Sequence, residues 1–196
     1  MVGRGRPLGE EGGELSRVEI SAGYAGDAER FAGLFADSFA ASEGPDEGTL
    51  IGSLVRDILA RTDPGDLYCF VARDGETLIG AVCFTRLRYV EDPRRVFLLS
   101  PMAVAPTRQR KGVGQRLIRH ALAELSSAGV EALLTYGDPA YYGRVGFDPI
   151  AEAAIAAPYP LTIPQGWLGQ SLTPTPLGTF AGRPHCVAAF QRPEIW

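Results

Sequence analysis

The sequence predicts an α/β fold: one domain with a mixed sheet of about six to seven strands, flanked by about four helices. Three observations predict it. The chain has 196 residues, which suits one domain with a sizeable core better than two. Hydrophobic residues make up 45% and charged residues 21%, as in ordinary globular proteins. Segments with the alternation of strands are interspersed with segments of helical periodicity.

Turn and capping residues justify the order of these elements. Asp27 suits the N-cap of a helix with one apolar face, and Asp74-Gly75 between two β-rich runs favours a hairpin. Asp138 followed by Pro139 is typical of a helix start. In chain order we expect strand 17–21, two helices between residues 27 and 61, strands 67–72, 77–86 and 95–104, helix 112–127, strand 130–136, a short helix from 139, and a final strand at 185–191.

Composition excludes several classes of protein. The net charge of -4 and a pI of about 5.3 argue against a nucleic-acid binder, which needs a basic surface. The cysteines Cys69, Cys83 and Cys186 are isolated in apolar runs and there are only two histidines, so we predict no metal site. No apolar run is long enough to span a membrane and no secretion signal precedes the domain, so a cytoplasmic location is the default expectation.

The segment from Val104 to Ile118 carries the clearest chemical signal. An apolar strand ends, a short loop follows with Arg108, Arg110 and Lys111, and a helix then opens at two glycines. A helix N-terminus offers unpaired N–H groups and partial positive charge, and glycine lets the backbone approach an anion closely. The residues therefore suit a polyanionic cofactor.

Two other phosphate loops fail to fit this segment. The triphosphate loop GxxxxGK[ST] is absent, and the dinucleotide pattern GxGxxG fails because its third glycine is Leu117. The pattern that remains is Gln109-x-x-Gly112-x-Gly114. A phosphate-loop protein for another nucleotide is thus disfavoured.

This pattern after a strand resembles the acetyl-CoA pyrophosphate loop of the GNAT superfamily of N-acetyltransferases. A second segment, YGDPAYYGRVGF at 136–147, resembles a later motif of that family. Together with LLSPMAVAP at 98–106, this segment is similar in sequence to the YhbS-like branch of the family. The two motifs cover about a quarter of the chain, and the order of strands and helices extends the resemblance over residues 17–150.

The resemblance implies a site and a co-substrate, acetyl-CoA. Tyr142 is expected beside the cofactor sulfur as the acid that protonates the departing thiolate, with Tyr141 as the alternative. Pro101 in a central strand makes sense at a bulge, where the fourth and fifth strands splay apart and admit the cofactor. The residues expected to bind the cofactor are Met102, Ala103, Val104, Gln109, Arg110, Lys111, Gly112, Val113, Gly114 and Tyr141.

The expected organisation follows. Residues 1–14 are predicted to be a disordered tail, and 15–196 an N-acetyltransferase domain. Its cofactor half spans 97–150, a Pro/Gly-rich late loop spans 158–184 with no regular structure assigned, and the final strand lies at 185–191.

The predicted function is direct transfer of the acetyl group of acetyl-CoA onto a small-molecule or peptide amine of unknown identity. The alternative is a sensor module that binds acetyl-CoA without transfer, because residues 98–101 lack the carboxylate that many relatives place on the fourth strand. Glu43, Glu47 and a water chain stay open as the general base. No nucleic-acid or membrane partner is expected, and the resemblance allows for a homodimer.

Overall fold

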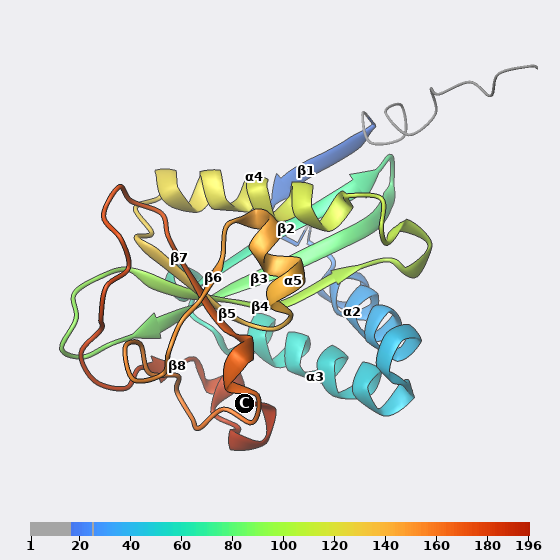
Figure 1. The fold of residues 1–196 in the computed structure, drawn as a ribbon. Helices are drawn as coiled ribbons and strands as arrows, with labels where there is room; N and C mark the ends of the chain where they lie inside the picture. Colours follow the sequence, from blue (N-terminus) through green and yellow to red (C-terminus); the bar gives the residue numbers. More distant parts are fainter. Residues whose placement is uncertain (1–16, 25) are drawn as a thin grey trace, which may run out of the picture.

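The computed structural model describes residues 17–24 and 26–196, so the predicted tail 1–14 lies outside the described residues. Its elements are shown in Figure 1. The strands are β1 (Val18–Ala22), β2 (Leu67–Asp74), β3 (Thr77–Arg88), β4 (Val96–Val104), β5 (Ala132–Tyr136), β6 (Asp148–Pro149), β7 (Trp167–Ser171) and β8 (His185–Cys186). The helices are α2 (Ala28–Glu43), α3 (Pro45–Arg61), α4 (Val113–Ser127) and the short α5 (Pro139–Tyr142).

The strands of the described residues form one eight-stranded sheet in the order β1-β2-β3-β4-β5-β7-β6, with β8 beside β3. Strands β4 and β5 are parallel, and the other neighbours are antiparallel. This confirms the predicted mixed sheet and the order of elements up to α5. None of the helices in the described ranges has the length and apolar character that crossing a membrane requires.

The late part of the chain differs from the prediction. The Pro/Gly-rich loop 158–184 contains strand β7, which pairs along the whole of β5 and covers its edge. Its residues Trp167, Leu168 and Gly169 are all buried, so the alternating pattern that predicts a strand is missing. The final strand is shorter than 185–191, because after Cys186 the chain turns into a 3-10 helix at Ala188–Phe190.

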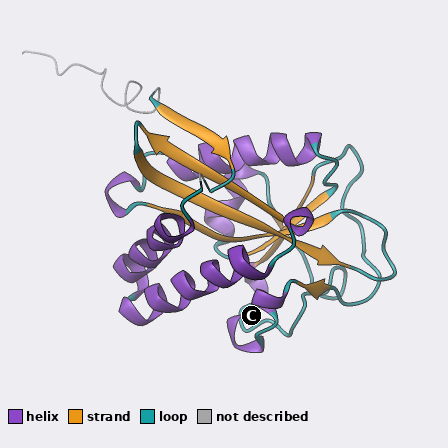
Figure 2. Cartoon of the chain, turned by 180° about the vertical axis from the view of Figure 1, so that it is seen from behind, coloured by secondary structure: helices purple, strands orange, loops and turns teal. Residues whose placement is uncertain are grey.

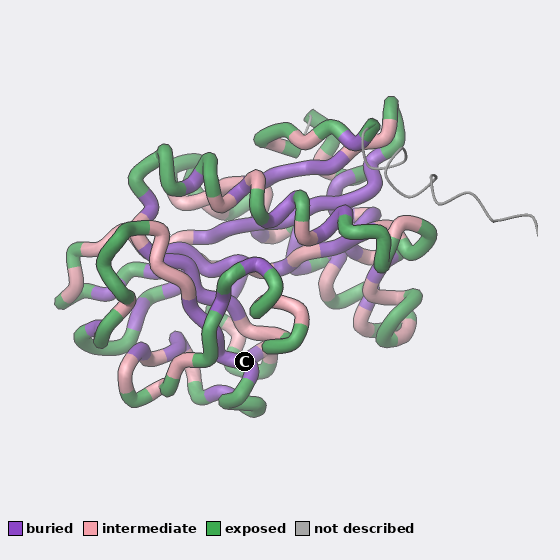
Figure 3. The backbone as a smooth tube through the Cα atoms, turned by 45° about the horizontal axis from the view of Figure 1, so that its top comes forward, coloured by how far each residue is buried: buried purple, intermediate pink, exposed green. Residues whose placement is uncertain are grey.

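Helices cover both faces of the sheet in three layers. Figure 1 shows α4 over one face, and Figure 2 shows α2 and α3 side by side on the other. Helix α4 buries Leu117, Ile118, Ala121 and Leu125, at the spacing of one helical face. Figure 3 shows the result: the buried backbone runs through the sheet in the middle of the molecule.

The parallel pairing of β4 with β5 stops before β4 ends. It runs from Val96 to Leu99, which pairs with Thr135, whereas β4 continues to Val104. The register between β4 and β3 shifts at the same place, so that Ser100 and Pro101 together face Cys83. This is the predicted bulge at Pro101. It leaves the last residues of β4 without a neighbour on the β5 side.

Candidate active site

The free edge of β4 presents backbone groups to the opening beside β5. Ala105 N–H donates to the carbonyl of Ile79 at 2.9 Å, in register with the β3–β4 ladder. Bonding alternates along an antiparallel pair, so the groups of Ala103 point to β3 and those of Met102 and Val104 point away from it. Met102 and Val104 therefore form a free strand edge to which an extended ligand could add as a further strand.

One of these backbone groups, the carbonyl of Val104, already accepts hydrogen bonds from within the protein. The Val104 carbonyl accepts hydrogen bonds from Ser38 Oγ at 3.0 Å and from Gln109 Nε2 at 3.1 Å. Ser38 is a buried residue of α2, so the helix on the opposite face takes part in holding this loop. By the same alternation, the N–H and C=O of Met102 and the N–H of Val104 face the opening. The side chain of Gln109 thus turns back to the end of β4.

The loop after β4 ends at an uncapped helix. Gly112, the N-cap of α4, has φ 79°, and no side chain of the described residues caps the helix there. The amides of the first helical turn, from Val113 to Gln115, thus lack a side-chain cap among the described residues and lie at the positive end of the helix dipole. Arg110 also has a positive φ, of 60°. Such a conformation costs a non-glycine residue about 1 kcal/mol or more and is common where a loop clamps a ligand.

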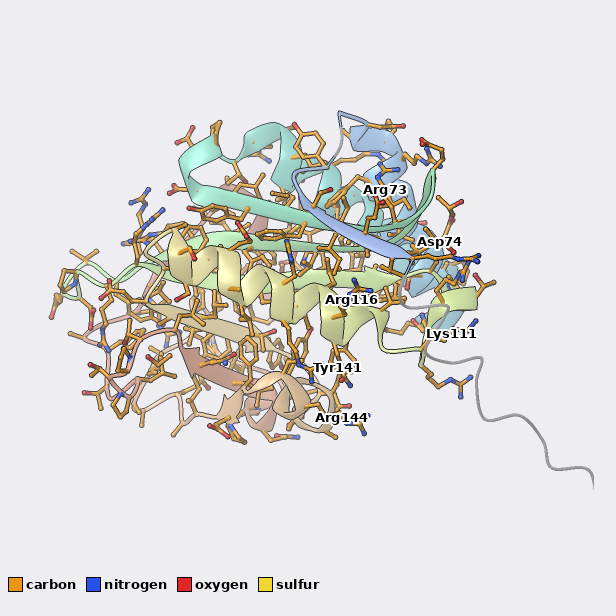
Figure 4. All side chains as sticks on the ribbon, turned by 90° about the horizontal axis from the view of Figure 1, so that it is seen from above. Arg73, Asp74, Lys111, Arg116, Tyr141 and Arg144 are labelled. Atoms are coloured by element: carbon orange, nitrogen blue, oxygen red, sulfur yellow. The ribbon has the colours of Figure 1, made fainter. Side chains whose placement is uncertain are left out.

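A cavity of about 580 Å³ joins the strand edge to this helix N-terminus. Figure 4 shows Tyr141 and Arg144 on one side of α4, with Arg73 and Asp74 on the other. Arg108 reaches from the cavity wall to Asp74, with 2.7 Å between Nη2 and Oδ2. The cavity is lined by Met102, Val104, Arg108, Gln109, Arg110, Gly112, Val113, Gly114, Gln115, Tyr141 and Arg144.

Most of the sequence-predicted cofactor residues thus meet in one cavity, but two do not line it. Ala103 is buried in the cluster beneath α2, and its backbone faces β3. Strand alternation directs it to the opposite face from its neighbours. Lys111 is exposed in the loop and lies outside the cavity lining.

Tyr141 lies over the start of α4. Its hydroxyl is 3.8 Å from Met102 Sδ. A β-carbon added at Gly114 would come within 2.3 Å of the same hydroxyl, so glycine is required for this close approach. Burial, together with the charge of Tyr142, raises the pKa of Tyr141 from 10.0 to about 12. The phenol therefore keeps its proton throughout the neutral range.

Tyr142, the expected proton donor, does not belong to the cavity lining and packs behind Tyr141. Its ring is perpendicular to that of Tyr141, with centroids 5.1 Å apart. Burial raises the pKa of Tyr142, whereas a side-chain hydrogen bond with Thr135 works in the opposite direction. Thr135 is itself buried and donates to the carbonyl of Leu99 at 2.9 Å. The Tyr142 phenol is thus anchored where β4 and β5 part.

Sequence reasoning missed Gln115, which lines the cavity, and three further residues of this arrangement. Thr135 is a polar residue that ends the apolar run 132–134, and that contrast is a usable signal. Arg144 lies inside the quoted motif at 136–147 but had no role assigned. Ser38 gives no signal, because an isolated serine in an amphipathic helix has many explanations. Within the described part of the chain, no cluster of His, Cys, Asp and Glu side chains could hold a metal ion.

The two acids considered as general base lie apart from the cavity. Glu43 is the exposed last residue of α2, and Glu47 is partly exposed in the first turn of α3. Neither belongs to the cavity lining.

Comparison with known proteins agrees with this geometry. The profile of the Acetyltransferase (GNAT) family matches residues 29–147, more than half of the chain. The chain therefore belongs to the GNAT acetyltransferase family. The predictions of an acyltransferase and of acetyl-CoA as its co-substrate are confirmed at the level of this family.

Individual relatives extend the likeness. "Uncharacterized N-acetyltransferase YjhQ" of Escherichia coli K12 is 35% identical over 148 residues, covering 72% of this chain and 78% of YjhQ. "Uncharacterized N-acetyltransferase YhbS" of the same strain is 31% identical over 93 residues, covering 47% of this chain and 56% of YhbS. The Escherichia coli YhbS structure in complex with CoA superposes with a TM-score of 0.71 at 26% identity, covering 90% and 93% of the two chains.

A second solved structure supports the fold alone. It is a GNAT acetyltransferase from Brucella melitensis in complex with acetyl-CoA, with a TM-score of 0.61 at 24% identity, covering 88% of this chain and 97% of that one. The matches give no support to the alternative prediction of a sensor without transfer activity.

Proposed function

We propose that this protein transfers the acetyl group of acetyl-CoA directly onto an amine. One observation carries the proposal: the uncapped start of α4 and the open edge of β4 line the same cavity of about 580 Å³. The first feature suits a pyrophosphate and the second suits the amide-bearing arm that follows it in coenzyme A.

The binding roles follow from the contacts. The amides of Val113, Gly114 and Gln115 hold the pyrophosphate, with Arg110 adding positive charge. The backbone of Met102 and the N–H of Val104 pair with the pantetheine arm as an added strand. Gln109 positions the loop through the Val104 carbonyl, at 3.1 Å.

The chemical roles concern both ends of the transfer. Acetyl-CoA supplies an acetyl group activated as a thioester. The Met102 N–H donates to the carbonyl oxygen as negative charge develops there. As the carbon–nitrogen bond forms and the carbon–sulfur bond breaks, Tyr142 gives its proton to the departing sulfur. Its raised pKa keeps that proton available, and Tyr141 packs above the cofactor path.

Direct transfer is favoured over an acetylated cysteine. Cys69, Cys83 and Cys186 are all buried. Burial, and to a lesser extent the neighbouring Cys69, raises the pKa of the Cys83 thiol well above its usual range. This thiol is therefore a poor nucleophile. The amine must lose its proton to a water chain or to Glu43 or Glu47, and the water chain is favoured because neither acid lines the cavity.

Ligand ranking tests the binding part of the proposal. The full chain is mixed with acetyl-CoA, CoA, ATP and NAD, and unfolding temperatures are compared. We expect the two CoA compounds to stabilise the protein more than ATP or NAD. Release of free thiol from acetyl-CoA with a panel of amines tests the transfer part. Equal stabilisation by all four compounds contradicts the proposed site.

A further inference from the structure

We infer that the acceptor is a small primary amine carried on an apolar body, bound in a second hollow at the end of β5 with its ammonium group at Asp138. The inference rests on the proposed function and deepens it. The hollow has a volume of about 350 Å³. It is lined by Tyr136, Gly137, Asp138, Pro139, Ile163, Gln165 and Gly166.

The hollow lies next to the ring of Tyr142. A β-carbon on Gly137 would lie 2.7 Å from Cε2 of Tyr142, so the tyrosine ring rests directly on this glycine. Gly137 also lines the hollow. One residue without a side chain therefore separates the hollow from the ring proposed to serve the sulfur, and a bound amine lies close to the reacting centre.

The hollow also opens on the appropriate face of the sheet. Successive side chains of a strand point to opposite faces. Thr135 contacts Tyr142, which packs in the cluster beneath α4, whereas Tyr136 packs in the cluster that contains residues of α3. The rings of Tyr142 and Tyr136 thus lie on opposite faces at the end of β5, and the hollow opens beside Tyr136.

The walls of the hollow are built before any ligand binds. Tyr136 Oη accepts from the N–H of Ile163 at 2.7 Å and lies 3.0 Å from Thr162 Oγ1. Gly137 N–H donates to the carbonyl of Gly166 at 2.9 Å. These bonds tie the end of β5 to the loop before β7 and fix the backbone around the hollow.

The chemistry of the lining indicates the acceptor class. Tyr136, Pro139 and Ile163 present apolar surface, and Ile163 is 53% exposed. Asp138 is the one charged residue in the lining. One of its oxygens accepts from the N–H of Ala140 at 2.8 Å, which holds the carboxylate in place at the start of α5.

This lining disfavours an acceptor with many polar groups. Apart from Asp138, the side-chain groups available in the hollow are the amide of Gln165 and the engaged hydroxyl of Tyr136. A polyhydroxylated polyamine would bury polar groups without partners, which is costly. An apolar monoamine needs apolar walls and one anionic group: the lining is almost wholly apolar, and Asp138 is the acid among its residues.

Steady-state kinetics with the full chain test the inference. The acceptors are 2-phenylethylamine and the aminoglycoside sisomicin, and free thiol is measured. We expect kcat/KM for 2-phenylethylamine to exceed that for sisomicin by about tenfold or more. Ile163→Ser and Asp138→Asn, which retains a capping side chain, are each expected to raise the KM for 2-phenylethylamine about tenfold or more. Both are expected to leave the Kd for acetyl-CoA within about twofold.

Matched surface variants provide the controls. Val90→Ser changes an apolar side chain that is 78% exposed, and Asp37→Asn changes an exposed acid on α2. Both should leave the KM for the amine unchanged. A preference for sisomicin, transfer to neither amine by a protein that binds acetyl-CoA, or an unchanged KM in Ile163→Ser and Asp138→Asn overturns the acceptor class. Failure to bind acetyl-CoA is a different result and overturns the proposed function itself.

Discussion

The hydroxyl of Tyr141 occupies the space that a side chain on Gly114 would need: a β-carbon there would come within 2.3 Å of this oxygen. The same β-carbon would lie 2.9 Å from Met102 Cε. One glycine therefore lets three elements meet, because α4, α5 and the free edge of β4 converge at this point. The shape of the proposed cofactor channel depends on that close approach.

Gly114→Ala is expected to weaken acetyl-CoA binding about tenfold or more, with a loss of about 1–3 kcal/mol in unfolding free energy, because the added methyl group overpacks the site. Calorimetry and urea unfolding measure the two effects. Adding Tyr141→Phe removes the nearest atom and should restore part of the lost stability. Gly33→Ala is the control, since a β-carbon on Gly33 meets nothing within 4 Å. Equal effects of Gly114→Ala and Gly33→Ala would contradict the prediction.

Tyr142→Phe separates a proton donor from a packing residue. We expect kcat to fall about 10²–10⁴-fold while the KM for acetyl-CoA changes little, because the ring still packs on Gly137 and Phe147. Tyr141→Phe should lower kcat less than about tenfold. The measurement is thiol release at saturating amine. Similar losses in the two variants would remove the distinction between the tyrosines.

Ser38→Ala tests the brace that α2 provides to the phosphate loop. The change removes the hydroxyl that donates to Val104 at 3.0 Å, so we expect a loss of about 1–2 kcal/mol in unfolding free energy and weaker acetyl-CoA binding. Ser42→Ala on the same helix removes an exposed hydroxyl and should change stability by less than about 0.5 kcal/mol. Urea unfolding with and without acetyl-CoA measures both. A loss of stability with unchanged affinity would show that Ser38 does not act through the loop.

Arg144→Ala tests the positive charge on the α5 side of the cavity. Its backbone carbonyl accepts from Arg119 at 2.9 Å, so the segment stays anchored when the side chain is removed. We expect acetyl-CoA to bind about three- to tenfold more weakly at low salt, and the dependence of affinity on salt to decrease. Titrations at two salt concentrations measure this. Arg61→Ala, at the exposed end of α3, should match the wild type.

The parts of the fold that could be predicted are those bounded by capping and turn residues. Asp27 accepts from the N–H of Arg30 at 2.9 Å and Asp138 from that of Ala140 at 2.8 Å, as their positions before helices predict. Strand β7 was not predictable in this way. It is buried on both faces between β5 and β6, so it lacks alternation, and it pairs with residues 31 to 39 positions earlier in the chain.

The candidate site shows the same division. The loop at Gly112 and Gly114 was predictable because glycine spacing and a following helix are local features. The contact of Ser38 with Val104 joins residues 66 positions apart, and only the packing of α2 on the sheet creates it. Ala103 lies in the predicted segment, yet strand alternation turns it to the other face.

Alkaline unfolding tests the burial of Tyr141. Burial raises the pKa of this phenol from 10.0 to about 12, so the unfolded chain loses the proton first as pH rises. Between these two values the folded protein binds more protons than the unfolded chain, and the unfolding free energy must fall. The stabilisation is complete below pH 10 and is lost towards pH 12. The wild type should therefore lose stability more steeply over this range than Tyr141→Phe, as measured by urea midpoints at successive pH values. Tyr24→Phe, outside both cavities, should follow the wild type, and parallel curves for wild type and Tyr141→Phe would contradict the prediction.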